Sequence, residues 1–426
     1  MNGLIIFGLL VVLMLTGMPI SIALGLTVMT FIFGFTQVPL ESVALKLFTG
    51  IEKFEIMAIP FFILAGNFLT HGGVAKRMIN FASSLVGHWY GGLGLASVLA
   101  CALFAALSGS SPACVVAIGS IMLPAMVKAG FPPRFGAGVI TTSGALGILI
   151  PPSIAMVMYS VSTNTSLSGL FLAGVVPGAM LAFMLGVTTW WRARKNNYPR
   201  MVKATWAQRG KTLRDSFWGL LLIVVVMGGI YSGLFTPTEA AAMAAVYAFF
   251  VAVFVYKDIS LKDVPKVLLS SANMSAMLLY IITNAVLFSF VLANEQIPQH
   301  LADWLVGMGL GPIAFLLVVN ILLLMAGNFM EPSSIILIMA PILFPVAMTL
   351  GIDPVHFGIL IIVNMEVGMC HPPVGLNLYV ASGITKMGIS ELTVAVWPWL
   401  ATMLVFLVIV TYWPGLSLWL PHLMLK

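Results

Sequence analysis

Residues 144–153, Gly-Ala-Leu-Gly-Ile-Leu-Ile-Pro-Pro-Ser, interrupt a segment, 134–165, that otherwise has the composition of a membrane helix. Pro151 and Pro152 supply no backbone N–H, so carbonyl groups upstream of them lose their helical partners. In hydrocarbon every N–H and C=O must be paired, and irregular backbone persists only where it is buried or lines a cavity. We therefore predict a broken helix over 134–165 with a protein-lined interruption.

The second half of the chain repeats this arrangement. A long apolar stretch begins at Pro354 and is interrupted at residues 368–373, Gly-Met-Cys-His-Pro-Pro. In each copy the helix-starting proline and the first proline of the interruption are 18 positions apart. The interval from the proline of the hairpin tip, Pro112 or Pro332, to the first proline of the interruption is 39 positions against 40. Such register predicts an internal repeat rather than prolines that merely punctuate loops. The matching positions are Pro112, Gly130, Pro133 and Pro151 in one copy and Pro332, Gly351, Pro354 and Pro372 in the other.

Each broken helix follows two short apolar arms joined by a polar tip that contains proline. This pattern is typical of a re-entrant hairpin, which enters the membrane and returns to the same side. The first hairpin has arms 92–107 and 113–128 with its tip at 108–112, and the second has arms 311–326 and 335–349 with its tip at 327–332.

Charged residues orient the two copies. The turn after the first hairpin carries Lys128 and Arg134, whereas the corresponding turn of the second copy carries only Asp353. Eight of the 19 basic residues lie between 192 and 214. Because basic residues favour the cytoplasmic side, we predict that the first turn and the 192–214 loop are cytoplasmic and that the second turn is external. The two repeats are therefore inverted, and both termini are expected to be periplasmic.

The composition is that of an all-α polytopic membrane protein. Of the 426 residues, 61% are hydrophobic and 8% are charged, against about 25% charged in an ordinary globular domain. The apolar residues run from end to end and provide about 10–11 spans of about 20 residues each, although 3–16 and 17–35 could also form one long tilted helix. The net charge of +6 reflects the cytoplasmic loop and indicates no nucleic-acid partner.

Signatures of catalysis are missing from the sequence. It contains no Gly-rich phosphate loop followed by Lys and Ser or Thr, and its six histidines are scattered rather than clustered as metal ligands. The three cysteines lie in apolar surroundings and predict no disulfide framework. We therefore expect no enzyme activity, no cofactor and no metal other than coupling ions.

Inverted repeats that each hold a hairpin and a broken helix are the usual construction of secondary transporters. Carbonyl groups freed at 147–152, together with the hydroxyls of Ser108, Ser110 and Ser111, suit a small hard cation such as sodium. Half-helix N-termini near the same depth attract anions. The alternative is that the Ser-Gly-Ser-Ser tip only permits tight helix packing. An equivalent second sodium site would use Gly327, Asn328, Gly368, His371 and Pro373, unless His371 only forms a hydrogen bond within the break.

Two carboxylates in apolar segments, Glu331 and Glu366, are functional candidates because buried charges within a membrane are costly. The alternatives are a protonated packing residue at Glu366 and a hydrated side chain at Glu331. For the substrate we predict contacts with Ser111, Glu331 and Asn377.

Four motifs stand out, Ser-Gly-Ser-Ser-Pro-Ala (108–113), Gly-x-x-x-Pro-Pro-Ser (147–153), Gly-Asn-Phe-Met-Glu-Pro (327–332) and His-Pro-Pro-Val-Gly-Leu-Asn (371–377). Together they resemble the large membrane (DctM-type) subunit of TRAP transporters, the tripartite ATP-independent periplasmic transporters, and the resemblance covers essentially the whole chain. This resemblance implies an elevator-type fold in a bacterial inner membrane and sodium-coupled uptake of an organic acid. It also implies a separate small membrane subunit (DctQ-type) and a periplasmic substrate-binding protein. It assigns Ser108, Ser110, Gly147, Ile150 and Pro152 to a first sodium site.

On this interpretation the hairpins and broken helices form a transport domain and the remaining segments form a scaffold. Two rival functions remain, a standalone sodium-coupled anion symporter without a binding protein and, less favoured, a passive channel. The expected divisions are 1–91 (scaffold spans and arm), 92–165 (first transport segment), 166–310 (scaffold spans, the basic loop 192–215 and the second arm), 311–386 (second transport segment) and 387–426 (C-terminal scaffold span and tail).

Overall fold

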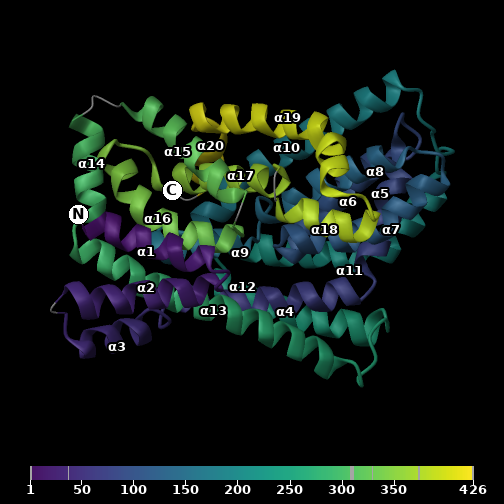
Figure 1. Cartoon of the computed structure of the whole chain (residues 1–426). Coiled ribbons are helices and arrows are strands. Elements are labelled where there is room, and N and C mark those ends of the chain that lie inside the picture. Colours follow the sequence, from purple (N-terminus) through teal and green to yellow (C-terminus); the bar gives the residue numbers. More distant parts are fainter. Residues whose placement is uncertain (1, 37, 308–310, 329, 373–374, 425–426) are drawn as a thin grey trace.

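A computed structural model describes residues 2–36, 38–307, 311–328, 330–372 and 375–424 of the chain, and every regular element in these ranges is a helix (Figure 1). Eight of these helices are long and apolar enough to cross a membrane, and further short apolar helices accompany them. The expected all-α membrane fold is confirmed.

The first repeat contains the predicted hairpin and broken helix. Helices α6 and α7 are the two arms of the hairpin, and Gly109 joins them in a left-handed conformation, φ +58°, which a residue with a side chain rarely adopts. The broken helix follows as α8, a short 3₁₀ turn η2, an irregular stretch through the two prolines, and α9. The bounds are α6 Gly92–Ser108, α7 Ser111–Lys128, α8 Pro133–Gly144, η2 Ala145–Ile148 and α9 Ile154–Thr163.

The second repeat has the same order of elements with one difference. Its broken helix continues through Cys370, so the interruption begins at His371 rather than at Gly368. The reason is local, because His371 precedes Pro372 and therefore takes an extended conformation, φ −91° and ψ 135°. The elements are α15 Pro312–Gly327, α16 Pro332–Thr349, α17 Pro354–Cys370 and α18 Leu376–Thr385.

Two long helices pack directly on the hairpins and broken helices. Helix α10 (Leu167–Lys195) lies against α6, and α19 (Ile389–Tyr412) lies against α8 and α17. The two helices also contact each other, since Trp399 Nε1 donates a hydrogen bond to Thr189 Oγ1 at 2.8 Å, and the hydroxyls of Thr188 and Thr402 are also 2.8 Å apart. We call the assembly of α6–α10 and α15–α19 the central body.

A second group of helices packs on the central body, and in Figure 1 its members α2, α4 and α13 lie along the lower edge of the molecule. Helix α4 packs closely against α12, α11 packs on α12, and α13 contacts both α2 and α4. We call this group the flanking layer. It meets the central body where α4 contacts α6 and where α13 contacts α16. Its members are α2 Ile20–Phe35, α4 Ala58–His71, α11 Trp206–Tyr231, α12 Pro237–Phe250, which continues as a π-helical turn η3 Val251–Val255, and α13 Val264–Asn294.

Two shorter helices connect the groups at the places where arms were expected. Helix α5 (Val74–Val86) packs on both α6 and α11, and α14 (Ile297–Gly307) packs on α16 and α13. Each therefore contacts one hairpin and one helix of the flanking layer. The apolar face of α5 buries Val74, Met78 and Ile79, and its polar face leaves Lys76 exposed.

The structure decides between the two predictions for the N-terminal region, two separate helices or one long tilted helix. Helices α1 (Asn2–Leu15) and α2 are separate and pack side by side, so a single long tilted helix is wrong. The chain reverses at Gly17, whose φ of +82° favours glycine.

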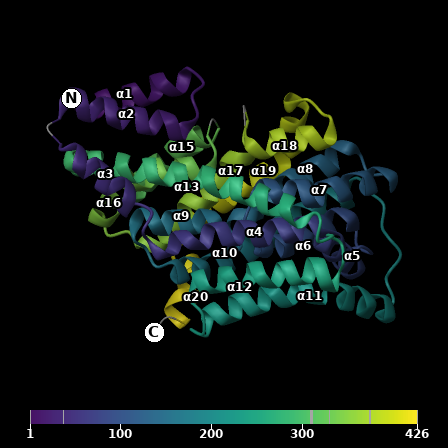
Figure 2. The same ribbon diagram turned by 90° about the horizontal axis from the view of Figure 1, so that it is seen from below.

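Three short elements were not anticipated, namely α3 Leu40–Thr49, η1 Phe54–Met57 and α20 Gly415–Met424. In Figure 2 both labelled chain ends lie at one side of the molecule and the long loop between α10 and α11 lies at the other.

Candidate functional site

The first hairpin tip presses against the first helix break. A Cβ atom added to Gly147 would lie 2.5 Å from the carbonyl oxygen of Ser110, and one added to Gly109 would lie 2.9 Å from the carbonyl oxygen of Pro152. Real Cβ atoms do not approach so closely, so the tip and the break can meet only because both positions are glycine. The structure therefore brings together the predicted sodium-site residues Ser110, Gly147 and Pro152.

Several oxygens in this contact have no hydrogen-bond donor among the described residues. The carbonyl oxygens of Gly147, Ile150 and Pro152 accept no hydrogen bond from the described residues, whereas the Ile148 carbonyl accepts one from Ser153 Oγ at 2.6 Å. Ser108 is buried, and its hydroxyl lies 3.4 Å from the Ser110 carbonyl and 3.3 Å from Cys114 Sγ. Free carbonyls beside a serine hydroxyl are hard oxygen ligands, which suit a small cation.

The second tip and break meet in a related way. A Cβ atom on either Gly327 or Gly368 would lie 3.0 Å from the Cα of the other, and Asn328 Oδ1 lies 3.0 Å from His371 Nδ1. Gly368 also occupies the place of Gly147, since both pairs Gly147–Gly368 and Pro151–Pro372 are 221 residues apart.

Some oxygens of this second contact already accept hydrogen bonds. The Asn328 side chain is held by His371, and the Gly368 carbonyl accepts a hydrogen bond from the His371 N–H at 3.2 Å. His371 therefore joins the break to the hairpin tip rather than bonding only within the break. Pro373 lies outside the described residues, so this set of ligands is less complete than the first.

A buried amide joins the two repeats. Asn377, near the start of α18, donates from Nδ2 to Ser111 Oγ at 2.7 Å and lies 3.4 Å from the Thr141 carbonyl. Both Asn377 and Ser111 are fully buried, and Asn377 Oδ1 has no hydrogen-bond partner among the described residues. Two of the three predicted substrate residues are thus in direct contact.

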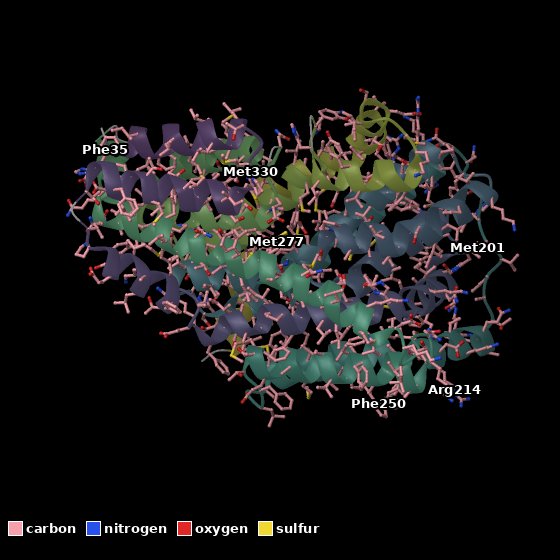
Figure 3. The ribbon with its side chains drawn as sticks, turned by 60° about the horizontal axis from the view of Figure 1, so that its bottom comes forward. Phe35, Met201, Arg214, Phe250, Met277 and Met330 are labelled. Carbon is pink, nitrogen blue, oxygen red and sulfur yellow. The ribbon has the colours of Figure 1, made fainter. Side chains whose placement is uncertain are left out.

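A cavity of about 420 Å³ lies where the tips meet the flanking layer. The N-terminal ends of four helices line it, the hairpin arms α7 at Ser111 and α16 at Pro332 and the half-helices α9 at Ile154 and α18 at Leu376. Helix α13 forms the facing wall through Met274, Met277 and Leu278, and Figure 3 shows Met277 near the middle of the molecule. Helix N-termini carry partial positive charge and free N–H groups. The cavity is therefore suited to an anion.

Comparison with known proteins agrees with this architecture. A family model described as the DctM component of the tripartite ATP-independent periplasmic transporters matches residues 7–416. The chain belongs to this family of TRAP transporter permeases. It is 74% identical to the C4-dicarboxylate TRAP transporter large permease protein DctM of Rhodobacter capsulatus, with all of both chains covered, and 56% identical to the protein of that name from Pseudomonas aeruginosa, with 94% of each covered.

A solved structure shares the fold at low sequence identity. The crystal structure of the YdaH transporter of Alcanivorax borkumensis, described as revealing an unusual topology, matches with a TM-score of 0.63 at 16% identity over 90% of each chain. The chain is accordingly a multi-pass membrane permease of a TRAP-type secondary transporter and not an enzyme. The resemblance identified from its motifs is confirmed.

The two acidic candidates of the permease occupy different places. Glu331 lines the cavity, and its Oε1 accepts a hydrogen bond from Ser334 Oγ at 3.2 Å. Glu366 is fully buried in α17, and neither carboxylate oxygen has a hydrogen-bond partner among the described residues. Glu366 does not line the cavity, so only Glu331 is placed to act on a ligand there.

Sequence reasoning missed the polar residues that the flanking layer contributes. Asn67 and Thr70 of α4 line the cavity, and Asn67 Nδ2 donates to Ser271 Oγ of α13 at 2.8 Å. An amide within an apolar span is itself a signal, because a polar group in the membrane requires a partner. No group of three or more His, Cys, Asp or Glu side chains gathers as a metal site in the described parts of the chain.

Proposed function

We propose that this permease carries C4-dicarboxylates across the bacterial inner membrane by sodium-coupled uptake. It would work with a small membrane subunit and a periplasmic binding protein that delivers the substrate. The observation that carries the proposal is the convergence of four helix N-termini on one cavity, close to carbonyl oxygens that accept no hydrogen bond from the described residues. The identity to permeases named for C4-dicarboxylates supports the choice of substrate.

The charge requirements of a dicarboxylate fit the cavity. Two carboxylates can each receive N–H groups from helix N-termini, with Ser111 and Asn377 holding the tip in place. A carboxylate at Glu331 would repel this substrate, so Glu331 acts through a bound cation or a proton. Sodium bound at Ser108, Ser110, Gly147, Ile150 and Pro152 would offset the substrate charge and fix the tip against the break.

The coupling of sodium to substrate follows from the hairpin tip, which belongs to both the sodium site and the cavity wall. If sodium orders the tip that also forms the cavity wall, sodium raises the affinity for substrate, and substrate must raise the affinity for sodium by the same factor. The second contact, at Gly327, Asn328, Gly368 and His371, would hold another cation in the same way. Its partly occupied oxygens predict weaker binding there.

We further propose an elevator movement of the central body against the flanking layer. The cavity lies at their boundary, so the site can move across the bilayer without exposing the tips to lipid. The packing of α10 and α19 against α6 and α8 favours their moving with the hairpins. The mobile unit proposed here is therefore larger than segments 92–165 and 311–386.

The proposed orientation places the loop between α10 and α11 in the cytoplasm. That loop and the adjoining turns carry Arg192, Arg194, Lys195, Arg200 and Lys203, and basic residues favour the cytoplasmic side. The N-terminal helix and α20 would then begin and end on the periplasmic side.

Reconstitution tests this function. The permease and its small subunit are placed in proteoliposomes, and radiolabelled succinate uptake is measured with and without the binding protein and an inward sodium gradient. We expect accumulation above the external concentration only when both are present. Uptake without the binding protein would favour the standalone symporter. Equilibration without accumulation would favour the passive channel, and accumulation with potassium replacing sodium would remove the sodium coupling.

A further inference from the structure

An apolar groove runs between two helices of the central body, away from the transport cavity. It has a volume of about 350 Å³ and lies between Leu95, Val98 and Ala102 of α6 and Phe183 and Val187 of α10. Phe183 is 71% exposed, which shows that the groove is open at the surface. We call it the α6/α10 groove.

The groove ends at two tryptophans that also border a second hollow, which contains one guanidinium group. Trp89 and Trp190 line both spaces, and the hollow, of about 480 Å³, is completed by His88, Tyr90 and Arg200. The Arg200 guanidinium lies 3.8 Å from the centre of the Tyr90 ring and donates to the Tyr90 hydroxyl at 2.9 Å. This leaves most of its five donors unused by the described residues.

No acidic side chain lines the hollow among the described residues, and basic residues adjoin it in the sequence. Arg192, Arg194 and Lys195 follow Trp190 at the end of α10, and no Asp or Glu occurs in the sequence between Glu55 and Asp215. The His88 Nδ1 atom is buried without a hydrogen-bond partner among the described residues. The hollow therefore offers donors and positive charge to an anionic group, directly beside a space for hydrocarbon.

We propose that the α6/α10 groove and this hollow together bind one phospholipid with an anionic headgroup. The phosphate would sit against Arg200, Tyr90 and His88, and an acyl chain would lie between α6 and α10. Tryptophans at the junction are the side chains that favour the level where headgroups meet chains. From Leu95 to Ala102 the groove follows about 10 Å of helix, which corresponds to most of the roughly 15 Å of one leaflet.

The chemistry of the groove and the hollow favours an anionic phospholipid over a free phosphate or a zwitterionic lipid. A free phosphate would make no use of the apolar groove, and a zwitterionic lipid would gain less from a hollow whose described lining includes the Arg200 guanidinium and no acidic side chain. Because Val86 and Trp89 belong to the end of α5 and the turn that follows, the lipid would contact both the arm and the central body.

Native mass spectrometry can test the site on the full-length chain in complex with its small membrane subunit. The complex is equilibrated with equal amounts of phosphatidylglycerol and phosphatidylethanolamine, and the retained lipids are counted. We expect wild type to retain phosphatidylglycerol in preference. Arg200→Ala should lower that preference about fivefold, the effect of one basic charge near a headgroup. Lys203→Ala is the matched control, because it removes the same charge from an exposed position in the same loop.

A second variant fills the groove without touching the charges. A Cβ on Gly186 would lie 3.9 Å from Leu95 Cδ2, so Gly186→Leu should fold and occupy the space of the acyl chain. We expect it to reduce retention of phosphatidylglycerol as well. Equal effects of Arg200→Ala and Lys203→Ala would overturn the proposal in favour of diffuse attraction. Full retention in Gly186→Leu, or a cross-link from a cysteine at the exposed position Phe183 to the small subunit, would also overturn it.

Discussion

The side-chain amide of Asn377 donates a hydrogen bond to Ser111 Oγ at 2.7 Å, although the two residues lie in opposite repeats of the chain. Asn377 is in the first turn of α18, after the second helix break, and Ser111 begins α7, after the first hairpin tip. The bond therefore ties together two helix N-termini that line the same cavity. Its position links the geometry of one tip to the break of the other repeat.

Replacing Asn377 with Ala should impair substrate binding. The change removes the donor to Ser111 and Thr141, and leaving a buried group unsatisfied costs about 1–3 kcal/mol. We expect the KM for dicarboxylate uptake to rise roughly tenfold, since about 1.4 kcal/mol corresponds to that factor. Uptake kinetics in proteoliposomes measure it. Asn196→Ala is the control, because Asn196 is exposed and bonds only to the Arg192 carbonyl. An unchanged KM in Asn377→Ala would separate this bond from substrate binding.

The double variant Ser108→Ala, Ser110→Ala should raise the sodium concentration needed for half-maximal uptake. It removes two hydroxyls of the hairpin tip, where the Ser110 backbone packs against Gly147, and leaves the backbone oxygens in place. Sodium titration of uptake reports the change. Ser120→Ala in the same hairpin serves as the control, because the Ser120 hydroxyl bonds within its own helix to Ala117. The same sodium dependence in a correctly inserted double variant would remove this site.

Adding a methyl group at either helix break should stop transport. In Gly147→Ala the new Cβ meets the Ser110 carbonyl at 2.5 Å, and in Gly368→Ala it meets Gly327 Cα at 3.0 Å. Overpacking of this kind costs about 1–3 kcal/mol and displaces the tip. Gly383→Ala in α18 has nothing within 4 Å of its Cβ and should transport normally. Uptake rates of the three variants, measured at equal membrane abundance, test this expectation. Normal transport by Gly147→Ala would show that the close contact is not required.

The hairpins and breaks could be predicted because their signals are local. Pro151, Pro152 and Pro372 remove N–H groups wherever they stand, and Gly109 supplies a left-handed turn, so sequence alone locates these features within a few residues. The repeat spacing then relates one copy to the other. The break at His371 was placed three residues early because the helix tolerates Gly368 in its last turn.

The packing of the continuous helices could not be predicted from such local signals. Helices α10 and α19 are apolar on all sides, and no sequence pattern shows which neighbours they contact. Their place against α8 depends on fitting side chains, such as Trp399 over Gly138, where an added Cβ would lie 2.6 Å from the ring. The cavity residue Asn67 was missed for a related reason, since its neighbour Ser271 is 204 positions away.

Labelling of single cysteines should establish the topology. Lys203 lies in the loop between α10 and α11, and Leu234, which is 75% exposed, lies in the turn between α11 and α12 at the other end of α11. We expect a membrane-impermeant thiol reagent added from the periplasm to label Leu234→Cys but not Lys203→Cys. The native cysteines 101, 114 and 370 are buried, so background labelling should be low. Periplasmic labelling at position 203 would reverse the orientation proposed for both repeats.

Cross-linking can test whether the central body moves as proposed. Lys53, in the turn before α4, donates from Nζ to Asn164 Oδ1 at 2.7 Å at the end of α9, so this contact joins the flanking layer to the body. Bridging Lys53→Cys and Asn164→Cys with a short bifunctional thiol reagent should hold the two groups together and stop uptake without preventing assembly.

A matched bridge within the body gives the contrast. Thr188 and Thr402 join α10 to α19, with their hydroxyls 2.8 Å apart. If both helices move with the hairpins, bridging Thr188→Cys to Thr402→Cys should leave uptake close to that of the unbridged variant. Loss of uptake with this bridge would show that α10 and α19 move relative to each other and would return at least one of them to the scaffold. Normal uptake with the bridge between positions 53 and 164 would instead exclude movement of the whole body, and gating by the hairpin tips alone would become the better account.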